Sequence, residues 1–172
     1  STFAVDDTVV PRLSELPPLD DGEPRPVLAM TDENGTQAEF AASELILTTS
    51  DPAQADVFVQ RWQGEVLDSF DPAELGLTGV PGWYLVRVTV PAADLAKAAA
   101  DLKRAEPGAR NDLRFGSQAA LDLFALFVTE SAAGLSVTPN WVSLPQGLES
   151  GANNESATGR VPPGATPRSG AP

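Results

Sequence analysis

The side chains able to do chemistry in this sequence are carboxylates, hydroxyls, two lysines and nine arginines. The 172 residues contain no histidine and no cysteine. A serine or cysteine nucleophile activated by histidine, a Cys/His zinc site and a thiol redox centre therefore lack the residues that build them. The sequence predicts a chain that binds or accompanies another molecule, and not an enzyme.

The carboxylates that are neighbours in the sequence do not match a known type of site. Glu65, Asp68 and Asp71 are close together, but Asp68 and Asp71 flank the end of a predicted strand, where solvent is expected. The acidic run at residues 20–23 lacks the alternating oxygen ligands of a calcium loop. No glycine-rich phosphate loop is present. We therefore predict no catalytic residue, no metal ligand and no cofactor.

The net charge of −13 argues against nucleic acid or an anionic membrane as the partner, because no segment is basic enough to displace counterions from phosphates. A basic protein partner and plain solubility are both compatible with this charge. No apolar run approaches the roughly 20 residues that span a bilayer. The absence of cysteine, the Ala/Pro/Gly-rich composition and a first residue other than Met are typical of a processed bacterial protein that is secreted or held in the cell envelope or periplasm.

Composition divides the chain into three parts. Residues 1–37 are rich in proline and acidic residues, which predicts an extended leader with one short strand at residues 27–30 and a turn at Asn34-Gly35. Residues 38–146 hold nearly all the aromatic and aliphatic side chains, as a folded α+β domain requires. Residues 147–172 alternate Gly, Pro, Ser and Asn without apolar periodicity, which predicts a flexible tail or linker.

Within the central part, the apolar pattern alternates between strand and helix periods. Strands are predicted at residues 44–49, 65–70 and 83–90 from runs of aliphatic and aromatic residues. A helix follows the first strand, capped at Ser50-Asp51-Pro52 and ended by Gly64, and a second helix follows Pro91. The order strand, helix, strand, strand, helix is the beginning of the split βαβ plan.

Two segments compete for the strand that would close this plan. Residues 113–115 come directly after the second helix, whereas residues 137–143 come after a third helix that begins at Ser117 and ends at Gly134. We favour residues 137–143 and interpret residues 110–134 as an insertion. The predicted fold is α+β: a ferredoxin-like split βαβ sandwich, with an antiparallel sheet and helices on one face, plus an inserted third helix.

Three segments carry a resemblance to a known family: Glu44-Leu45-Ile46-Leu47, Trp62-Gln63-Gly64-Glu65-Val66 and Trp83-Tyr84-Leu85-Val86-Arg87-Val88. In this order, and followed by Pro139-Asn140, they resemble the N-terminal propeptides of secreted subtilisin-like serine proteases. The resemblance covers residues 42–106 and 137–145.

The resemblance implies a ferredoxin-like domain that assists the folding of its protease and then inhibits it. The sheet face would pack on the protease, and the segment after the last strand would occupy the substrate cleft. On this chain the residues expected to bind the protease are Asn140, Trp141, Val142 and Leu144. The catalytic residues would belong to a separate protease domain, which agrees with the absence of histidine here.

A second interpretation remains open. A ferredoxin-like sheet can also serve as an exported non-enzymatic binding or surface-interaction module, because its edge strands can pair with another chain. Trp141, beside the predicted tail, is a candidate for a residue that faces a partner.

Overall fold

The computed structural model describes residues 2–108 and 112–143, and in this part it is a mixed α+β fold with three α-helices and one eight-stranded mixed sheet. Nearly all of it belongs to one compact unit, Ser1–Val142; of the second unit, Ser143–Pro172, only Ser143 is described. The strands are β1 (Thr2–Val5), β2 (Glu15–Leu16), β3 (Arg25–Thr31), β4 (Gln37–Thr49), β5 (Glu65–Phe70), β6 (Gly82–Arg87), β7 (Asp112–Phe115) and β8 (Val137–Ser143). The helices are α1 (Pro52–Arg61), α2 (Leu95–Ala105), α3 (Gln118–Ala132) and a 3-10 helix, η1 (Pro72–Leu75).

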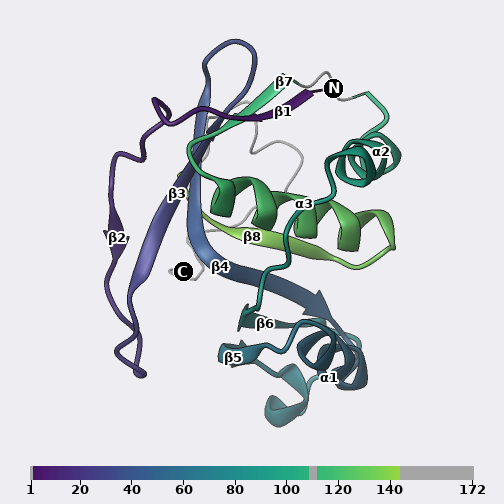
Figure 1. The fold of residues 1–172 in the computed structure, drawn as a ribbon. Helices are drawn as coiled ribbons and strands as arrows, with labels where there is room; N and C mark the ends of the chain where they lie inside the picture. Colours follow the sequence, from purple (N-terminus) through teal and green to yellow (C-terminus); the bar gives the residue numbers. More distant parts are fainter. Residues whose placement is uncertain (1, 109–111, 144–172) are drawn as a thin grey trace. The chain divides into compact units, whose positions relative to one another are not determined.

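The longest strand, β4, pairs with β3, β6 and β8, and so connects all parts of the sheet (Figure 1). Its residues 37–41 pair with β3, and its residues 44–49 pair with β6. Ser43, between the two halves, has a φ of 62°, in the left-handed region that few residues other than glycine adopt. We name the strands β8-β4-β6-β5 the first wing, and β1-β7-β3 with the N-terminal half of β4 the second wing.

The first wing follows the sequence prediction closely. Asp51 caps α1 by accepting a hydrogen bond from the backbone N–H of Ala53, and Pro52 occupies the first helical turn, as predicted. Ala55 and Phe58 are the buried residues of α1. Strand β6 is shorter than predicted, because it ends at Arg87 and not at residue 90.

The end of α1 differs from the prediction in one detail. Gln63, and not Gly64, has the positive φ (48°) that follows the helix. Gly64 is required for a different reason, since a Cβ there would lie 2.7 Å from Cγ1 of Val86 on β6. The helix therefore ends tightly against the sheet.

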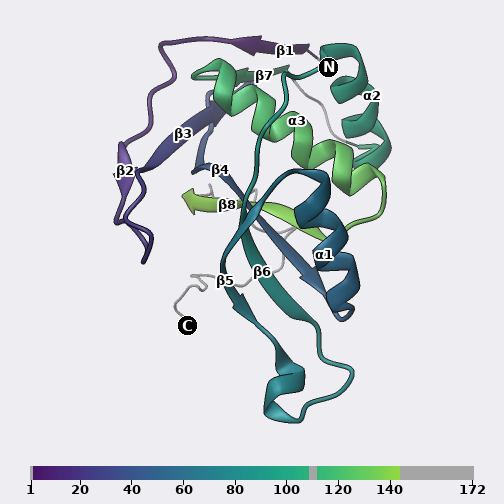
Figure 2. The ribbon, with the colours of Figure 1, turned by 60° about the horizontal axis from the view of Figure 1, so that its bottom comes forward.

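The third helix is the most apolar of the three and packs on β4 and on the second-wing strands β1, β3 and β7. Ser117 caps it and Gly134, with a φ of 99°, follows its end, as predicted. Its buried residues come from nearly every position around the helix: Ala120, Leu121, Leu123, Phe124, Ala125, Leu126, Val128 and Glu130. Helix α2 packs mainly against α3 (Figure 2).

The prediction that residues 1–37 form a leader outside the domain is wrong. Strand β1 pairs in parallel with β7, and β3 pairs with both β4 and β7, so the N-terminal segment builds the second wing (Figure 1). Phe3 stacks edge-on against Phe115 and Phe124. The prolines that suggested a leader lie mostly in the connections between these short strands. The strand predicted at 27–30 and the turn at Asn34-Gly35 are confirmed.

Both candidates for the closing strand are strands, but in different wings. Residues 112–115 form β7 in the second wing, and residues 137–143 form β8 beside β4 in the first wing. The favoured strand therefore lies next to the first strand of the predicted plan. The predicted tail, residues 147–172, lies outside the described residues.

Candidate protein-binding surface

The two faces of the first wing differ, because α1 and α3 lie on the same face. Arg61 and Trp62, at the end of α1, donate hydrogen bonds to the carboxylate of Glu130 on α3. Val86 points toward this face, since Gly64 lies against its side chain. Its neighbours on β6, Leu85 and Arg87, point to the opposite face, which we name the outer face.

A row of polar side chains crosses the outer face at one register, with one residue from each strand of the first wing. Arg87 on β6 lies opposite Glu44 on β4 and opposite Glu65 on β5. Asn140 on β8 donates a hydrogen bond of 2.9 Å from Nδ2 to Oε1 of Glu44. Polar side chains placed directly across neighbouring strands interact, and this row fixes the relative register of all four strands.

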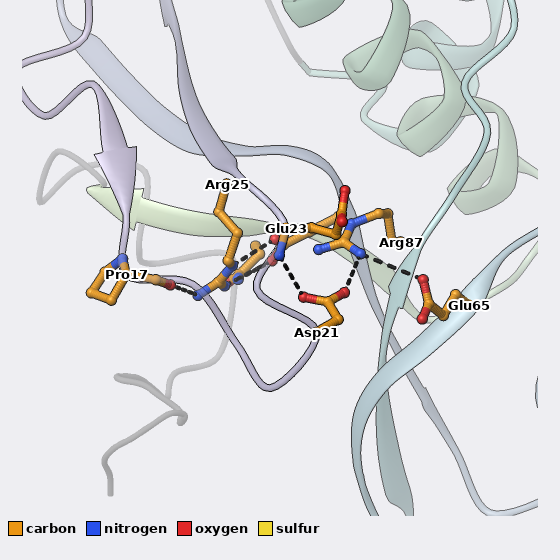
Figure 3. A network of polar contacts seen from close by, with 8 residues as sticks. Pro17, Asp21, Glu23, Arg25, Glu65 and Arg87 are labelled. Carbon is orange, nitrogen blue, oxygen red and sulfur yellow. Dashed lines mark hydrogen bonds and ion pairs between the residues drawn. The ribbon is translucent and has the colours of Figure 1, made fainter.

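At the centre of the row is a buried ion pair. Nε and Nη2 of Arg25, on β3, donate hydrogen bonds of 2.8 and 3.0 Å to the two carboxylate oxygens of Glu44. Nη1 of Arg25 donates to the backbone carbonyl of Pro17 (Figure 3). Glu44 is fully buried and Arg25 is 8% exposed, so the pair survives burial only because nearly every charged atom has a partner.

The second arginine joins the N-terminal segment to the first wing. Nη1 of Arg87 lies 2.6 Å from Oδ2 of Asp21 and 3.4 Å from Oε1 of Glu65 (Figure 3). The hydrogen bond from Arg87 lowers the pKa of Asp21 below its ordinary value, and a bond from the backbone N–H of Glu23 adds to the effect. The bond to Asp21 in turn raises the pKa of Arg87. Nη2 of Arg87 is buried without a hydrogen-bond partner among the described residues.

Beyond the polar row, most side chains of the outer face are apolar. The next two rows pair Leu85 with Ile46 and the exposed Asp68, and Trp83 with Thr48 and Phe70. Leu85 is buried, whereas Ile46, Trp83 and Phe70 are half-buried. Since α1 and α3 cover the other face, these side chains form an apolar centre on a flat sheet surface. Half-exposed aromatic and aliphatic groups bordered by charges are typical of protein-binding surfaces.

Strand β8 lies beside β4. Its residues direct their backbone hydrogen-bonding groups alternately toward β4 and away from it. Ser136, just before β8, accepts a hydrogen bond from Thr48 N–H, and Asn140 contacts Glu44, so the two strands run antiparallel. Residues at odd positions, including Pro139, then direct their backbone away from β4. A proline is tolerated in a strand at such a position, because no bond to the neighbour is lost.

The predicted binding residues are on β8, except Leu144, which lies outside the described residues. Asn140 is turned to Glu44. Trp141 is half-buried with its ring edge-on to Phe40, at 5.6 Å between ring centres and an interplanar angle of 80°. Val142 is half-buried. The structure therefore places three predicted residues on one strand, and whether they contact a partner stays a prediction.

The carboxylates considered for chemistry are not brought together. Glu65 contacts Arg87, Asp68 lies opposite Leu85, and Asp71 caps η1 through the N–H of Ala73. Over residues 2–108 and 112–143, no three acidic residues are grouped as metal ligands would be. No helix in the same part of the chain is both long and apolar enough to cross a membrane.

The buried pairing of Glu44 with Arg25, which organises the site, was not predicted from the sequence. Glu44 is an isolated acidic residue at the start of an apolar strand, and such a residue is buried only with a partner. Its partner comes from β3, which belongs to the segment that composition assigned to a leader. Comparisons of the chain with the models of known protein families, with curated proteins and with solved structures find no match.

Proposed function

We propose that this chain is a non-catalytic, propeptide-like domain that assists the folding of a secreted subtilisin-like serine protease, inhibits it, or both. The observation that carries the proposal is the arrangement of the first wing. If its strands are numbered along the chain from β4, they lie in the sheet in the order fourth (β8), first (β4), third (β6) and second (β5), with α1 and α3 on one face. This order supports the ferredoxin-like plan, and the ferredoxin-like plan is what the resemblance implies.

The outer face supports the same function. A domain that templates a folded partner needs a firm surface with an apolar centre and fixed polar groups. The half-buried side chains of Ile46, Phe70 and Trp83 supply the apolar centre, and Arg87 and Glu65, the accessible charged residues of the row, supply the polar groups. In the proposal, the outer face packs on the protease, and the chain leaving β8 near Trp141 approaches the substrate cleft.

The second wing and α2 are additions to the four-stranded plan, in which α1 and α3 supply the two helices. They lie beside β4 and on the helix-covered face, so neither covers the apolar centre of the outer face. In the proposal these elements stabilise the domain, because they add apolar core to a fold that would otherwise consist of a four-stranded sheet and two helices.

The proposal is tested by adding the whole chain to the subtilisin-like proteases of the source organism and following hydrolysis of a peptide substrate. At micromolar concentration it should slow one of them, and a chain ending before Trp141 should lose this effect. Refolding of that protease from denaturant should be faster with the chain present. No inhibition and no faster refolding for any of them would refute the proposal.

A pair of matched variants separates the outer face from the rest of the surface. Trp83→Lys places a charge in the apolar centre of the outer face and should weaken inhibition at least tenfold, as losing an aromatic anchor does at other interfaces (about 1.4 kcal/mol or more). Val57→Lys changes an exposed residue of α1, on the helix side, and should leave inhibition unchanged. Equal effects of the two variants would place the contact elsewhere.

A further inference from the structure

The loop between β5 and β6, residues 71–81, exposes apolar side chains without packing them on the domain. Leu75, Leu77 and Val80 are 67%, 46% and 43% exposed. The loop projects beyond the ends of the two strands that it joins (Figure 2). Asp71 caps η1 at its start, and Gly76 and Gly79 both have positive φ, so the loop has a defined conformation that holds its leucines outward.

Beside these side chains is a cavity of about 230 Å³ between the loop and the beginning of α1. Its walls include Leu77 and Val80 from the loop, Pro52 from α1 and the ring of Tyr84 from β6. The cavity is partly open to solvent, and by the same measure of volume one water molecule needs only about 10–15 Å³. The cavity can therefore admit an aliphatic side chain.

The charges around the cavity have one sign. Burial raises the pKa of the Tyr84 hydroxyl, and the negative charges of four carboxylates raise it further: Asp71, Asp56, Asp51 and Glu74. The sequence holds no lysine or arginine between residues 62 and 86. The two arginines that flank this stretch, Arg61 and Arg87, are bound to Glu130 and Asp21. The negative potential of this region is thus not balanced by neighbouring side chains.

We propose that residues 71–81 and the adjoining cavity form a docking surface for a lysine- or arginine-bearing segment of a partner protein, which inserts an aliphatic side chain into the cavity. Charge complementarity selects this partner: an anionic membrane is repelled, and so is a second copy of a chain with a net charge of −13. The surface is separate from the outer face, because Tyr84 alternates with Trp83 and Leu85 and points to the helix side. The proposal goes beyond the protease function and does not depend on it.

The test is fluorescence anisotropy of a labelled octapeptide that alternates lysine and leucine, titrated with the whole chain. We expect saturable binding that weakens roughly tenfold between 50 and 500 mM salt, because exposed charges are screened. Peptides that alternate glutamate with leucine, or lysine with serine, should bind at least roughly fivefold more weakly. The first lacks the positive charges, and the second lacks the aliphatic side chains. Equal binding of the three peptides would refute the proposal.

Variants of the chain locate the site. Leu77→Ser with Val80→Ser removes the apolar contacts, and Asp71→Asn with Glu74→Gln removes two charges while asparagine still caps η1. Each pair should weaken binding roughly fivefold. Two control variants should leave it unchanged: Leu13→Ser and Asp7→Asn, both exposed and distant in sequence.

Two results would overturn the assignment. If the control variants weaken binding as much as the loop variants, the peptide binds by general charge attraction and not at the cavity. If vesicles of neutral phosphatidylcholine bind the chain and the Leu77→Ser, Val80→Ser variant loses that binding, the loop contacts lipid and not a basic protein.

Discussion

The two wings of the sheet are built from segments with very different separation along the chain. In the first wing, β4, β5 and β6 follow one another with α1 between the first two, and only β8 comes from a distant segment. In the second wing, residues 2–5 pair in parallel with residues 112–115, so each pair is 110 positions apart in the sequence (112 − 2). The difference shows how a segment with few local signals acquires its structure. It is ordered by its partner strand and by the helix above it.

The wings also differ in what stabilises them. The first wing has aliphatic pairs across its strands, such as Leu45 with Val86, and a polar row on its outer face. The second wing has a cluster of phenylalanine rings between the sheet and α3. The ion pair between Arg25 on β3 and Glu44 on β4 connects the two.

The core of the second wing should be as important for stability as the core of the first. Phe115 is fully buried, with its ring centre 5.7 Å from Phe3 and 5.5 Å from Phe124. Phe115→Ala should lower the free energy of unfolding by about 3–5 kcal/mol, and Phe58→Ala, in the first wing, by a similar amount. Urea denaturation followed by tryptophan fluorescence measures both. If Phe115→Ala alone lowers the free energy of unfolding by less than about 1 kcal/mol, the second wing contributes little to the stability of the domain.

The ion pair that connects the wings gives the next prediction. Glu44→Gln leaves the buried guanidinium of Arg25 without its counter-charge and should cost about 3 kcal/mol of unfolding free energy. Glu65→Gln, in the same polar row but exposed, should change it by less than about 0.5 kcal/mol.

A double variant tests whether the charges of this ion pair, or only the volume that its side chains fill, stabilise the contact between the two wings. Arg25→Met with Glu44→Leu replaces the pair by apolar groups and should recover most of the stability lost in Glu44→Gln. If the double variant is instead the less stable of the two, the pair contributes a net attraction beyond satisfying its own burial.

A glycine at the end of β7 tests the N-terminal segment separately. A Cβ at Gly116 would collide with the backbone carbonyl of Val9, which passes directly over it. Gly116→Ala should therefore cost about 1–3 kcal/mol, because a backbone and not a flexible side chain must move. Gly108→Ala is the matched control, since a Cβ there would have no atom within 4 Å. Equal stability of the two variants would show that residues 6–10 are easily displaced.

The smallest effect concerns the contact between α2 and α3. Burial alone would raise the pKa of Asp101, but bonds from Lys97 and Thr129 and the charge of Arg104 outweigh it, so the pKa is lowered. A lowered pKa contributes stability above the ordinary value of 3.8, and this contribution is lost as the pH falls through the lower folded value. Asp101→Asn should therefore destabilise the protein at pH 7 more than at pH 2.5. Melting temperatures measured across this range would contradict the prediction if the difference stays constant.

Much of the first wing could be predicted from the sequence because its signals are local. Asp51-Pro52 before α1, Ser117 before α3 and Gly134 after it each act within a few residues. The alternation of apolar residues in β6 also shows which residues share a face. These signals do not depend on any distant part of the chain.

The second wing and the centre of the polar row could not be predicted in the same way. Strand β1 is four residues long, and its partner β7 is separated from it by nearly the whole domain. The prolines near β2 and β3 are strong loop signals, and they outweigh the weak sequence signals of the short strands between them. Arg25 and Glu44 are unremarkable until β3 and β4 are placed side by side.

The left-handed residue Ser43 allows one continuous strand to serve both wings, and this has a consequence for cooperativity. Neither wing can separate from the sheet without exposing the backbone of β4. The amide hydrogens of Phe40 and Leu45, on either side of Ser43, should therefore exchange with solvent through the same global opening. A partner bound to the outer face of the first wing would then slow exchange in the second wing by the same free energy, although it touches none of its residues.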